Sequence, residues 1–215
     1  MKLQRTTGTA IAVLAVSFGV AACGTDDDSG SKASAGDDTS SAAASAGAQT
    51  FGDGCASVPT KGAGSFDGMV NDPVATAASN NPLLSTLVSA VGAVDGLGDT
   101  LNGQEALTVF APYDGAFAEI PQKDLNGLVK EGEDKGQKSA LYSILAHHVL
   151  PTNAGPADVT GEQETLAGDG LTVEGDAESG MTVSDGTVTA NVLCGNIPTA
   201  NATVYVIDKV LTGVK

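Results

Sequence analysis

Two adjacent histidines, His147 and His148, are the residues of this sequence best suited to acid–base or metal chemistry. Side chains that are adjacent on a helix point about 100° apart, so the two rings face different surroundings. The residues one helical turn away on either side are not metal ligands: Ser143, Ile144, Pro151 and Thr152. We therefore expect no metal site. His148 falls on the apolar face of a predicted helix and is expected to be a core histidine bonded to the backbone or to a side chain, with a catalytic or binding role as the alternative.

Other catalytic patterns are missing from the sequence. It contains no Gly-x-Ser-x-Gly elbow, no Cys–His pair and no phosphate loop ending in Gly-Lys-Ser/Thr. The run Asp26–Asp28 lacks the spacing and the closing glutamate of a calcium loop. Asp114 and Glu119 could act as an acid or a base, but neither has an evident partner. We expect no catalytic residues, no metal and no cofactor.

The N-terminus predicts export and lipid anchoring. Lys2 and Arg5 precede an uncharged, apolar stretch that ends at Cys23, the pattern of a signal peptide. As a helix this stretch would reach roughly 25 Å at 1.5 Å per residue, short of a bilayer core of about 30 Å. Val20-Ala21-Ala22-Cys23 looks like a bacterial lipobox. We predict a signal peptide over 1–22, lipid on Cys23, and attachment to the outer face of the cell membrane, with partial release left open.

The composition of the segment after Cys23 and the net charge limit what the rest of the chain can be. Residues 24–50 are rich in Ser, Ala, Gly and Asp and contain no Val, Ile, Leu or aromatic residue before the domain. Such a composition predicts a flexible tether over 23–50. Residues 51–215 are long enough for one domain with its own core. The formal net charge of −16 excludes nucleic acid as a partner.

Two cysteines remain after Cys23 is assigned to lipid. Cys55 and Cys194 would reach an oxidising compartment with the exported chain. A remaining pair is most simply a disulfide, which would join the start of the domain to a point near its end.

The first half of the domain predicts helices. Asp72 can cap a helix with Pro73 at its first position, and Asn81-Pro82 repeats this arrangement. A buried strand is predicted over 107–110, ended by Pro112. Further helices are predicted over 115–120, around Leu125 and Leu128, and most strongly over 138–149.

The second half predicts strands over 171–173, 181–184, 187–190 and 203–207. Asp185-Gly186 indicates a two-residue hairpin turn between two of them. Helices followed by strands predict an α+β domain with a mostly antiparallel sheet. Asn201-Ala202-Thr203 matches a glycosylation acceptor, but a turn into a strand is the favoured interpretation.

Three segments resemble the conserved blocks of the fasciclin domain family, in the same order: Thr108–Phe117, Leu141–Leu150 and Asn201–Leu211. Thr165–Gly168 fits the family's Thr-Leu-x-Gly turn, and the resemblance spans about 68–211. The paired cysteines and the stretch 77–82 are similar to those of the mycobacterial secreted and lipid-anchored fasciclin antigens. The residues carried over as the family structural motif are Phe110, Ala111, Pro112, Phe117, His148, Asn201, Ile207 and Asp208.

The resemblance implies a β-wedge of mostly antiparallel strands with a layer of helices, and a role in adhesion at a cell surface or matrix. Three features depart from the family. Tyr113 stands where the family usually has a helix-capping Thr, a role that Asp114 could take over. His147 stands where the family has Tyr. The chain also has one such domain where many adhesion members have several, so it lacks avidity from linked domains.

The layout of anchor, tether and single domain predicts a surface-displayed binding module. Its partner would be an unidentified protein or glycan at the cell surface or matrix. The alternative is a carrier of a small apolar ligand such as a lipid, held in a cleft between helices and sheet. An enzyme on envelope polymers would need acid–base residues that converge in a cleft.

Overall fold

The computed structural model describes residues 45–214. The predicted signal peptide, Cys23 and most of the predicted tether lie outside the described residues. Within 45–214, no helix is long and apolar enough to cross a membrane. The Ala46 amide donates to the Asp67 carboxylate at 2.8 Å, and the Asn196 side chain donates to the Gln49 carbonyl at 3.0 Å. The last few residues assigned to the tether are therefore bonded to the domain.

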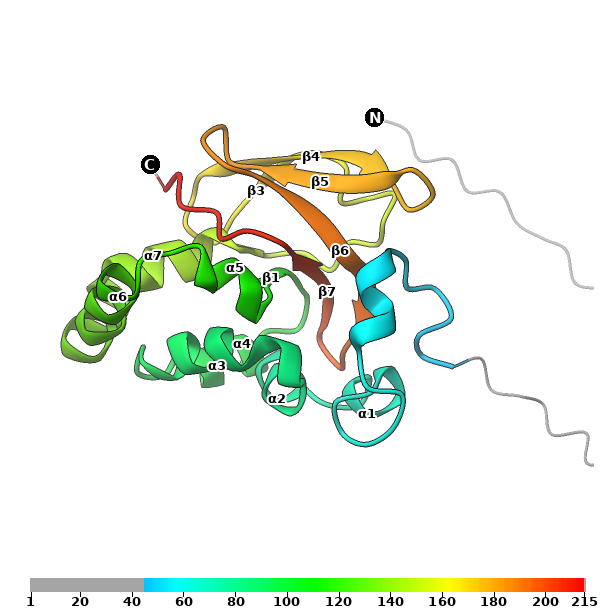
Figure 1. The fold of residues 1–215 in the computed structure, drawn as a ribbon, viewed down its shortest axis with the longest axis horizontal. Helices are drawn as coiled ribbons and strands as arrows, with labels where there is room; N and C mark the ends of the chain where they lie inside the picture. The colour runs from blue at the N-terminus through cyan, green and yellow to red at the C-terminus, as the bar shows by residue number, and fades with distance from the viewer. Residues whose placement is uncertain (1–44, 215) are drawn as a thin grey trace, which may run out of the picture. The chain divides into compact units, whose positions relative to one another are not determined.

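Seven strands within residues 45–214 form one sheet in the order β2-β1-β7-β6-β5-β4-β3 (Figure 1). Only β1 and β7 pair in parallel; the other neighbouring strands are antiparallel. The predicted α+β class with a mostly antiparallel sheet is confirmed. The strands are β1 Leu107–Pro112, β2 Val149–Leu150, β3 Gly161–Glu164, β4 Gly170–Asp176, β5 Gly180–Ser184, β6 Thr189–Pro198 and β7 Ala202–Ile207.

Strand β6 connects the two parts of the sheet. It pairs with β5 through residues 189–191 and with β7 through residues 192–198. Register shifts between Val192 and Cys194 and between Cys194 and Ile197 interrupt the second pairing. Such bulges bend a strand and increase its twist. In Figure 1, β6 accordingly passes from the layer of β3–β5 to that of β1 and β7, which gives the sheet its wedge form.

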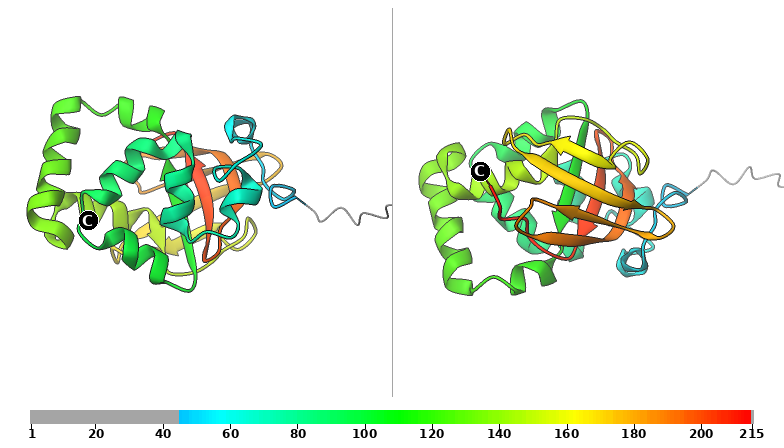
Figure 2. Two further views of the ribbon diagram at one scale, coloured as in Figure 1. Left: turned by 90° about the horizontal axis from the view of Figure 1, so that it is seen from below. Right: turned by 90° about the horizontal axis from the view of Figure 1, so that it is seen from above.

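The helices gather beside β1 and β7, away from β3–β5 (Figures 1 and 2). The α-helices of the described residues are α1 Phe66–Met69, α2 Val74–Asn80, α3 Ser85–Gly92, α4 Leu97–Gly103, α5 Asp114–Ala118, α6 Gln122–Lys135 and α7 Ala140–His147. Short 3-10 turns are η1 Asp53–Ser57, η2 Pro82–Leu84 and η3 Gly136–Lys138.

Two helix lengths differ from the sequence prediction. The short helix expected around Leu125 is the 14-residue α6, whose polar surface and two glycines hide its helical pattern. Gly132 allows α6 to pack closely on α7, because a Cβ at this position would lie 2.8 Å from Leu141 Cδ2 and the leucine side chain would have to move. The helix expected to run to residue 149 ends at His147, because β2 begins at Val149.

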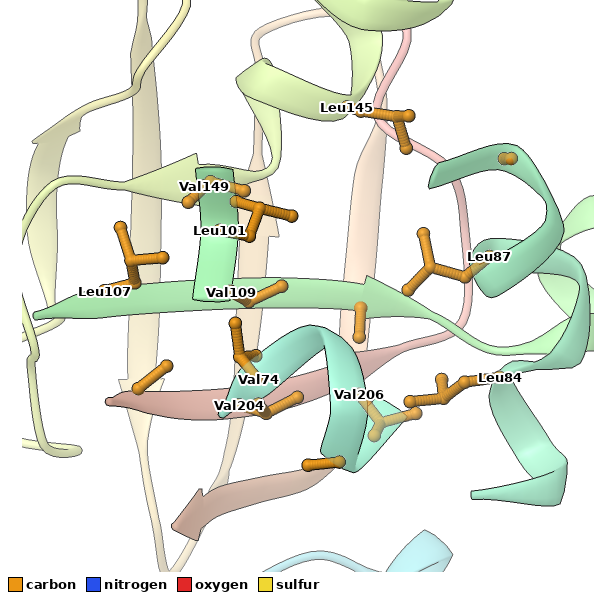
Figure 3. Close-up of a cluster of buried hydrophobic side chains, with 14 of the residues drawn as sticks. Val74, Leu84, Leu87, Leu101, Leu107, Val109, Leu145, Val149, Val204 and Val206 are labelled. Carbon is orange, nitrogen blue, oxygen red and sulfur yellow. The ribbon is translucent and has the colours of Figure 1, made fainter. Parts of the chain in front are cut away.

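The first core cluster lies between the helices and the sheet, and Figure 3 shows Leu87, Leu101 and Leu145 of α3, α4 and α7 facing strands β1 and β7. The second cluster lies between the two parts of the sheet. Successive residues of a strand point to opposite faces. Val109 and Val204 therefore enter the first cluster, whereas Phe110 and Tyr205 enter the second. Both faces of β1 and β7 are covered, which explains their continuous apolar sequences.

The predicted Asp185-Gly186 hairpin exists, but its loop is longer than two residues. Ser184 pairs with Thr189, so the loop contains four residues. The Asp185 carboxylate accepts hydrogen bonds from the amides of Thr187 and Val188 at 2.7 and 2.6 Å, which closes this longer turn. The side chain that suggested a tight turn instead folds into the loop it begins.

The predicted disulfide between Cys55 and Cys194 is confirmed. Its sulfur atoms are 2.01 Å apart, and the Cα atoms are 4.8 Å apart. The bond joins η1 to β6 beside the bridge that Phe51 forms with Gly195. It therefore fastens the first residues of the domain to the strand that connects the two parts of the sheet.

Candidate functional site

An apolar pocket lies where α2, α3, α4 and α7 meet β1 and β2. Its volume is about 90 Å³. Figure 3 shows Leu101 of α4 beside Val149 of β2, close to Val109 of β1. The lining residues are Val74, Ala75, Ala78, Leu87, Val88, Val91, Leu97, Thr100, Leu101, Gln104, Val109, Phe110, Tyr142, Leu145, Ala146, His148, Val149 and Leu166. None of them carries a permanent charge, so the pocket suits an apolar group.

Leu166 marks the open side of this pocket. It is the one large apolar side chain among residues 45–214 that is exposed, at 42%. Its amide donates to the Val149 carbonyl at 2.8 Å, which fixes the turn after β3 next to β2. A single exposed leucine is ordinary on a protein surface. This one lines the pocket, so it belongs to the same apolar surface as the buried residues behind it.

His148 lies in the core, as the sequence predicts, and is 3% exposed. Its Nδ1 is 2.7 Å from the Ile144 carbonyl, and its Nε2 accepts a hydrogen bond from the Leu211 amide at 3.0 Å. These two contacts select the neutral ring with the proton on Nδ1. Burial lowers the pKa of His148 to about 4, against the smaller opposing effect of the bond to Ile144. The ring therefore joins α7 to the C-terminal segment and lends an uncharged face to the pocket.

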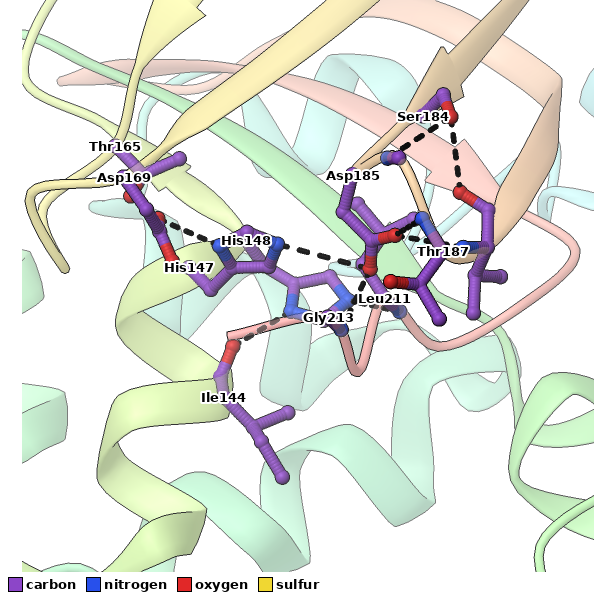
Figure 4. A network of polar contacts seen from close by, with 12 residues as sticks. Ile144, His147, His148, Thr165, Asp169, Ser184, Asp185, Thr187, Leu211 and Gly213 are labelled. Atoms are coloured by element: carbon purple, nitrogen blue, oxygen red, sulfur yellow. Dashed lines mark hydrogen bonds and ion pairs between the residues drawn. The ribbon is translucent and has the colours of Figure 1, made fainter. Parts of the chain in front are cut away.

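His147 is a titratable residue whose carboxylate neighbours could not be predicted from the sequence. It is 1% exposed, and Figure 4 shows it between Asp169 and Asp185. Its Nδ1 is 2.6 Å from Asp169 Oδ1, and its Nε2 is 3.8 Å from Asp185 Oδ2. Thr165, from the Thr-Leu-x-Gly turn, also bonds Asp169. The two carboxylates come 22 and 38 residues later in the chain, so helical spacing could not find them.

Asp185 is held mainly by the backbone. Its carboxylate also accepts a hydrogen bond from the Gly213 amide at 2.7 Å. Burial alone would raise the pKa of Asp185, but the bonds from Val188, Gly213 and Thr187, with the nearby His147, lower it overall. Asp169 and Asp185 also line a polar hollow of about 560 Å³ with Glu162 and Glu164. This side of the domain is acidic and offers no basic group among the residues that line it.

Asn201 organises three elements at once. Its Oδ1 accepts from the Val74 amide at 2.9 Å, and its Nδ2 donates to the carbonyls of Leu101 and Gln104 at 2.9 and 2.8 Å. It therefore caps the start of α2 and the end of α4 from the turn before β7. The expected cap, Asp72, instead accepts a bond from Asn80 at 3.1 Å. The carbonyl-bound amide of Asn201 agrees with its interpretation as a turn residue.

Asp114 also caps a helix, but a different one from the helix expected. Its carboxylate accepts from Ser85 Oγ at 2.6 Å and from the Thr86 amide at 2.7 Å, at the start of α3. It makes no side-chain cap on its own helix α5. Glu119 is exposed at the end of α5. Asp114 is thus engaged in structure, and the structure brings no acid–base partner to it.

The remaining motif residues hold the sheet together. Phe110 is fully buried, with its ring 5.7 Å from that of Tyr205, and Phe117 packs in the first core cluster. Ala111 and Pro112 pair with Val206 and Ile207. Asp208 accepts from the backbone and side-chain nitrogens of Asn191 at 2.7 and 2.6 Å, which joins the end of β7 to β6. The contacts of these residues are internal.

The geometry defines a class of fold: an α+β domain in which a wedge-shaped sheet packs against helices, with an apolar pocket between them. Among residues 45–214, no group of three or more His, Cys, Asp or Glu is arranged to hold a metal ion. The fasciclin domain model matches residues 82–213. The chain belongs to the fasciclin domain family.

Known proteins are similar in sequence to most of this chain. It is 45% identical over 171 residues to the cell surface glycolipoprotein MPB83 of Mycobacterium bovis, covering 76% of this chain and 72% of that protein. It is 44% identical over 168 residues to the immunogenic protein MPB70 of the same species, covering 74% and 80%. A FAS1 domain pair from the insect cell adhesion molecule fasciclin I is similar in structure, with a TM-score of 0.47 and 20% identity over 60% of this chain and 44% of that one.

Proposed function

We propose that this protein is a cell-surface binding module, held by lipid on Cys23 and acting in adhesion to another cell, a matrix or the cell envelope. Membership of the fasciclin family and the likeness to a cell surface glycolipoprotein support an extracellular, adhesion-related role. Fold does not fix function, so the partner must be identified from the surface that the domain presents.

One observation carries the proposal: the two ends of the domain differ. Residues 45–57 lie at one end, and α6 with the adjoining end of α7 lies at the other, in all three views (Figures 1 and 2). A chain anchored through its N-terminus would therefore be attached at the end opposite α6, which leaves α6 free to contact a partner. Four of the six lysines among the described residues lie there and are exposed: Lys123, Lys130, Lys135 and Lys138.

This distribution of charge gives the α6 end a distinct chemistry. The chain as a whole carries a formal charge of −16. The α6 end also carries Asp124, Glu131, Glu133 and Asp134, and Lys135 is paired with Glu131 at 2.8 Å, so this end is close to neutral whereas the rest of the domain is strongly acidic. It is therefore the part of the domain that an anionic surface or polymer repels least. Cell envelopes and matrix polymers are commonly anionic, so the α6 end is the proposed adhesive surface.

Retention of cells or matrix protein by the immobilised chain tests the proposal. The double variant Lys123→Glu, Lys130→Glu is expected to lower retention several-fold, because both side chains are exposed on α6. Lys61→Glu, at an exposed position before α1, changes the net charge as much as the single variant Lys130→Glu does, and these two single variants form the matched pair. Equal retention by the two variants would exclude the α6 end. Retention of nothing by the wild-type chain would exclude adhesion.

The alternative function considered from the sequence, binding of a small apolar ligand, is favoured by a separate observation, the apolar pocket. It uses none of the α6 lysines. Adhesion and ligand binding are therefore independent properties of one domain.

A further inference from the structure

The apolar pocket is too large to be a packing defect. Its volume of about 90 Å³ is several times the roughly 10–15 Å³ that one water molecule requires. Two other apolar voids among the described residues measure about 30 Å³ each. A protein interior is normally packed to the density of an organic crystal, with few voids larger than a water molecule.

The lining determines what can fill this space. Val, Leu and Ala side chains supply most of the wall, and His148 contributes only ring surface because both its nitrogens are bonded. Water would find few polar partners there. A cavity that accepts benzene measures roughly 150 Å³, which exceeds this volume. The narrower end of an aliphatic chain fits where an aromatic ring does not.

The pocket also has an entrance, so the occupant need not be small enough to be enclosed. Val88 and Val91 are half-buried, and Leu166 is 42% exposed, yet all three line the pocket. An apolar surface that runs from the interior to the exterior lets a chain enter by its end and leave its other end in solvent.

The polar residues at the entrance indicate the type of head group. Thr100 and Gln104 of the α4 region are exposed and line the pocket. The lining contains no Lys or Arg, and the chain carries a formal charge of −16, so an ionised carboxylate would find no counter-ion and a repulsive field. The Thr100 hydroxyl donates to the Gly96 carbonyl at 2.8 Å, so it can only accept from a ligand. An uncharged hydroxyl-bearing head can donate to it and exchange hydrogen bonds with the Gln104 amide.

We propose that this pocket binds a single-chain aliphatic amphiphile with an uncharged, hydroxyl-bearing head: the end of the chain lies between the helices and β1, and the head lies at Thr100 and Gln104. The proposal goes beyond adhesion and does not depend on it. A lipid molecule in solution and a lipid in a bilayer share this chemistry, and the test distinguishes them.

Calorimetric titration with 1-monodecanoylglycerol, kept below its aggregation concentration, provides the test. The mature chain, without residues 1–22 and carrying Cys23→Ser, is used without detergent, so that neither its own lipid nor the apolar segment before Cys23 competes. One saturable site is expected. Decanoate has the same tail length and an ionised head, and is expected to bind at least tenfold more weakly. Glycerol is expected not to bind.

Ala75→Leu blocks the pocket without opening the core. Ala75 is half-buried on α2 and lines this pocket, so the three heavy atoms that leucine adds would take space from the ligand at little cost in helix propensity. Binding is expected to weaken at least tenfold while the melting temperature is unchanged or raised. Ala140→Leu, an exposed position on α7 outside the pocket, is the matched control and should bind as the parent does.

The outcomes are decisive in both directions. Absence of saturable binding, or equal binding by folded Ala75→Leu, overturns the proposal. Decanoate binding as tightly as the monoacylglycerol overturns the assignment of the head group. Binding only to vesicles that contain the lipid, and never to the free molecule, would show that the protein recognises the bilayer surface, and would overturn the proposal that the pocket binds the lipid chain. Retention of cells by Ala75→Leu is expected to match that of the parent, so loss of one function is separable from loss of the other.

Discussion

The side chain of Asn201 accepts a hydrogen bond at 2.9 Å from the backbone amide of Val74, 127 residues earlier in the chain. The first turn of α2 is therefore capped by a residue near the C-terminal end of the domain. Because the same side chain donates to carbonyls at the end of α4, the contact can form only once β7, α2 and α4 are together.

Asn201→Ala is expected to lower the free energy of unfolding by about 1–3 kcal/mol, because it removes a helix cap and the donor to the part-buried Leu101 carbonyl. Urea denaturation measures the change. Asn201→Asp keeps the acceptor for Val74 but directs a carboxylate oxygen at the carbonyls of Leu101 and Gln104, and should therefore be no more stable than Asn201→Ala. Asp72→Ala, at the residue expected from the sequence to cap α2, should cost less than about 0.5 kcal/mol. A larger loss for Asp72→Ala than for Asn201→Ala would contradict this account.

The sequence predicts what depends on neighbours in the chain and misses what depends on the fold. The Asn81 cap was found because its bond to the Leu83 amide spans two residues. The caps made by Asn201 and Asp114 connect segments 127 and 28 residues apart, where no local pattern exists. The sequence pattern underestimates the length of α6 because this helix buries little apolar surface and contains two glycines, of which only Gly132 is explained by packing against α7.

The candidate sites divide in the same way. Helical periodicity alone predicts a core position for His148, and its contacts with Ile144 and Leu211 agree. The carboxylates beside His147 come from two loops of the sheet, so its environment required the structure. The pocket could be anticipated only as a cleft between helices and sheet, because its shape depends on side chains from four helices and two strands.

His148 is expected to make stability depend on pH. Its pKa is about 4 in the folded chain and about 6.5 when unfolded, so the unfolded state binds more protons between these values. The contribution is complete above pH 6.5 and is lost as pH falls to 4, by about 3 kcal/mol at 1.36 kcal/mol per pKa unit. Denaturant unfolding of wild type and His148→Gln across this range measures it, and the variant should show the shallower decline.

An independent measurement keeps this prediction testable if His148→Gln folds poorly. Titration of the His148 ring by NMR in the wild-type chain should show a midpoint near pH 4. A midpoint at or above 6.5 would contradict the burial of a neutral ring. Asp185, whose pKa is lowered, adds a further loss of stability only at pH values below about 4, so the two effects occupy different pH ranges.

The Cys55–Cys194 disulfide is expected to be a major source of stability. It links residues separated by 139 positions, and the chain-entropy model assigns a loop of this size about 5 kcal/mol at most. The double variant Cys55→Ser, Cys194→Ser should therefore unfold at a lower denaturant concentration than wild type. Wild type in excess reductant should approach the variant, while the variant should not respond. A variant as stable as the oxidised wild type would show that the bond constrains little.

Lipid attachment at Cys23 is the prediction that decides how the domain is displayed. Cys23 follows the apolar segment and two small residues, and lies before a Ser-, Ala- and Asp-rich stretch that ends where the domain begins. A single acyl chain binds a membrane only marginally, so stable display requires the multiple chains of a lipobox cysteine. Cys23→Ala is expected to abolish incorporation of a labelled fatty acid and to leave the protein either uncleaved or released into the medium. Cys55→Ser removes a cysteine that is engaged in the disulfide, and should incorporate as much label as wild type. Equal labelling of Cys23→Ala and wild type would show that the anchor lies elsewhere, and the orientation proposed for α6 would lose its basis.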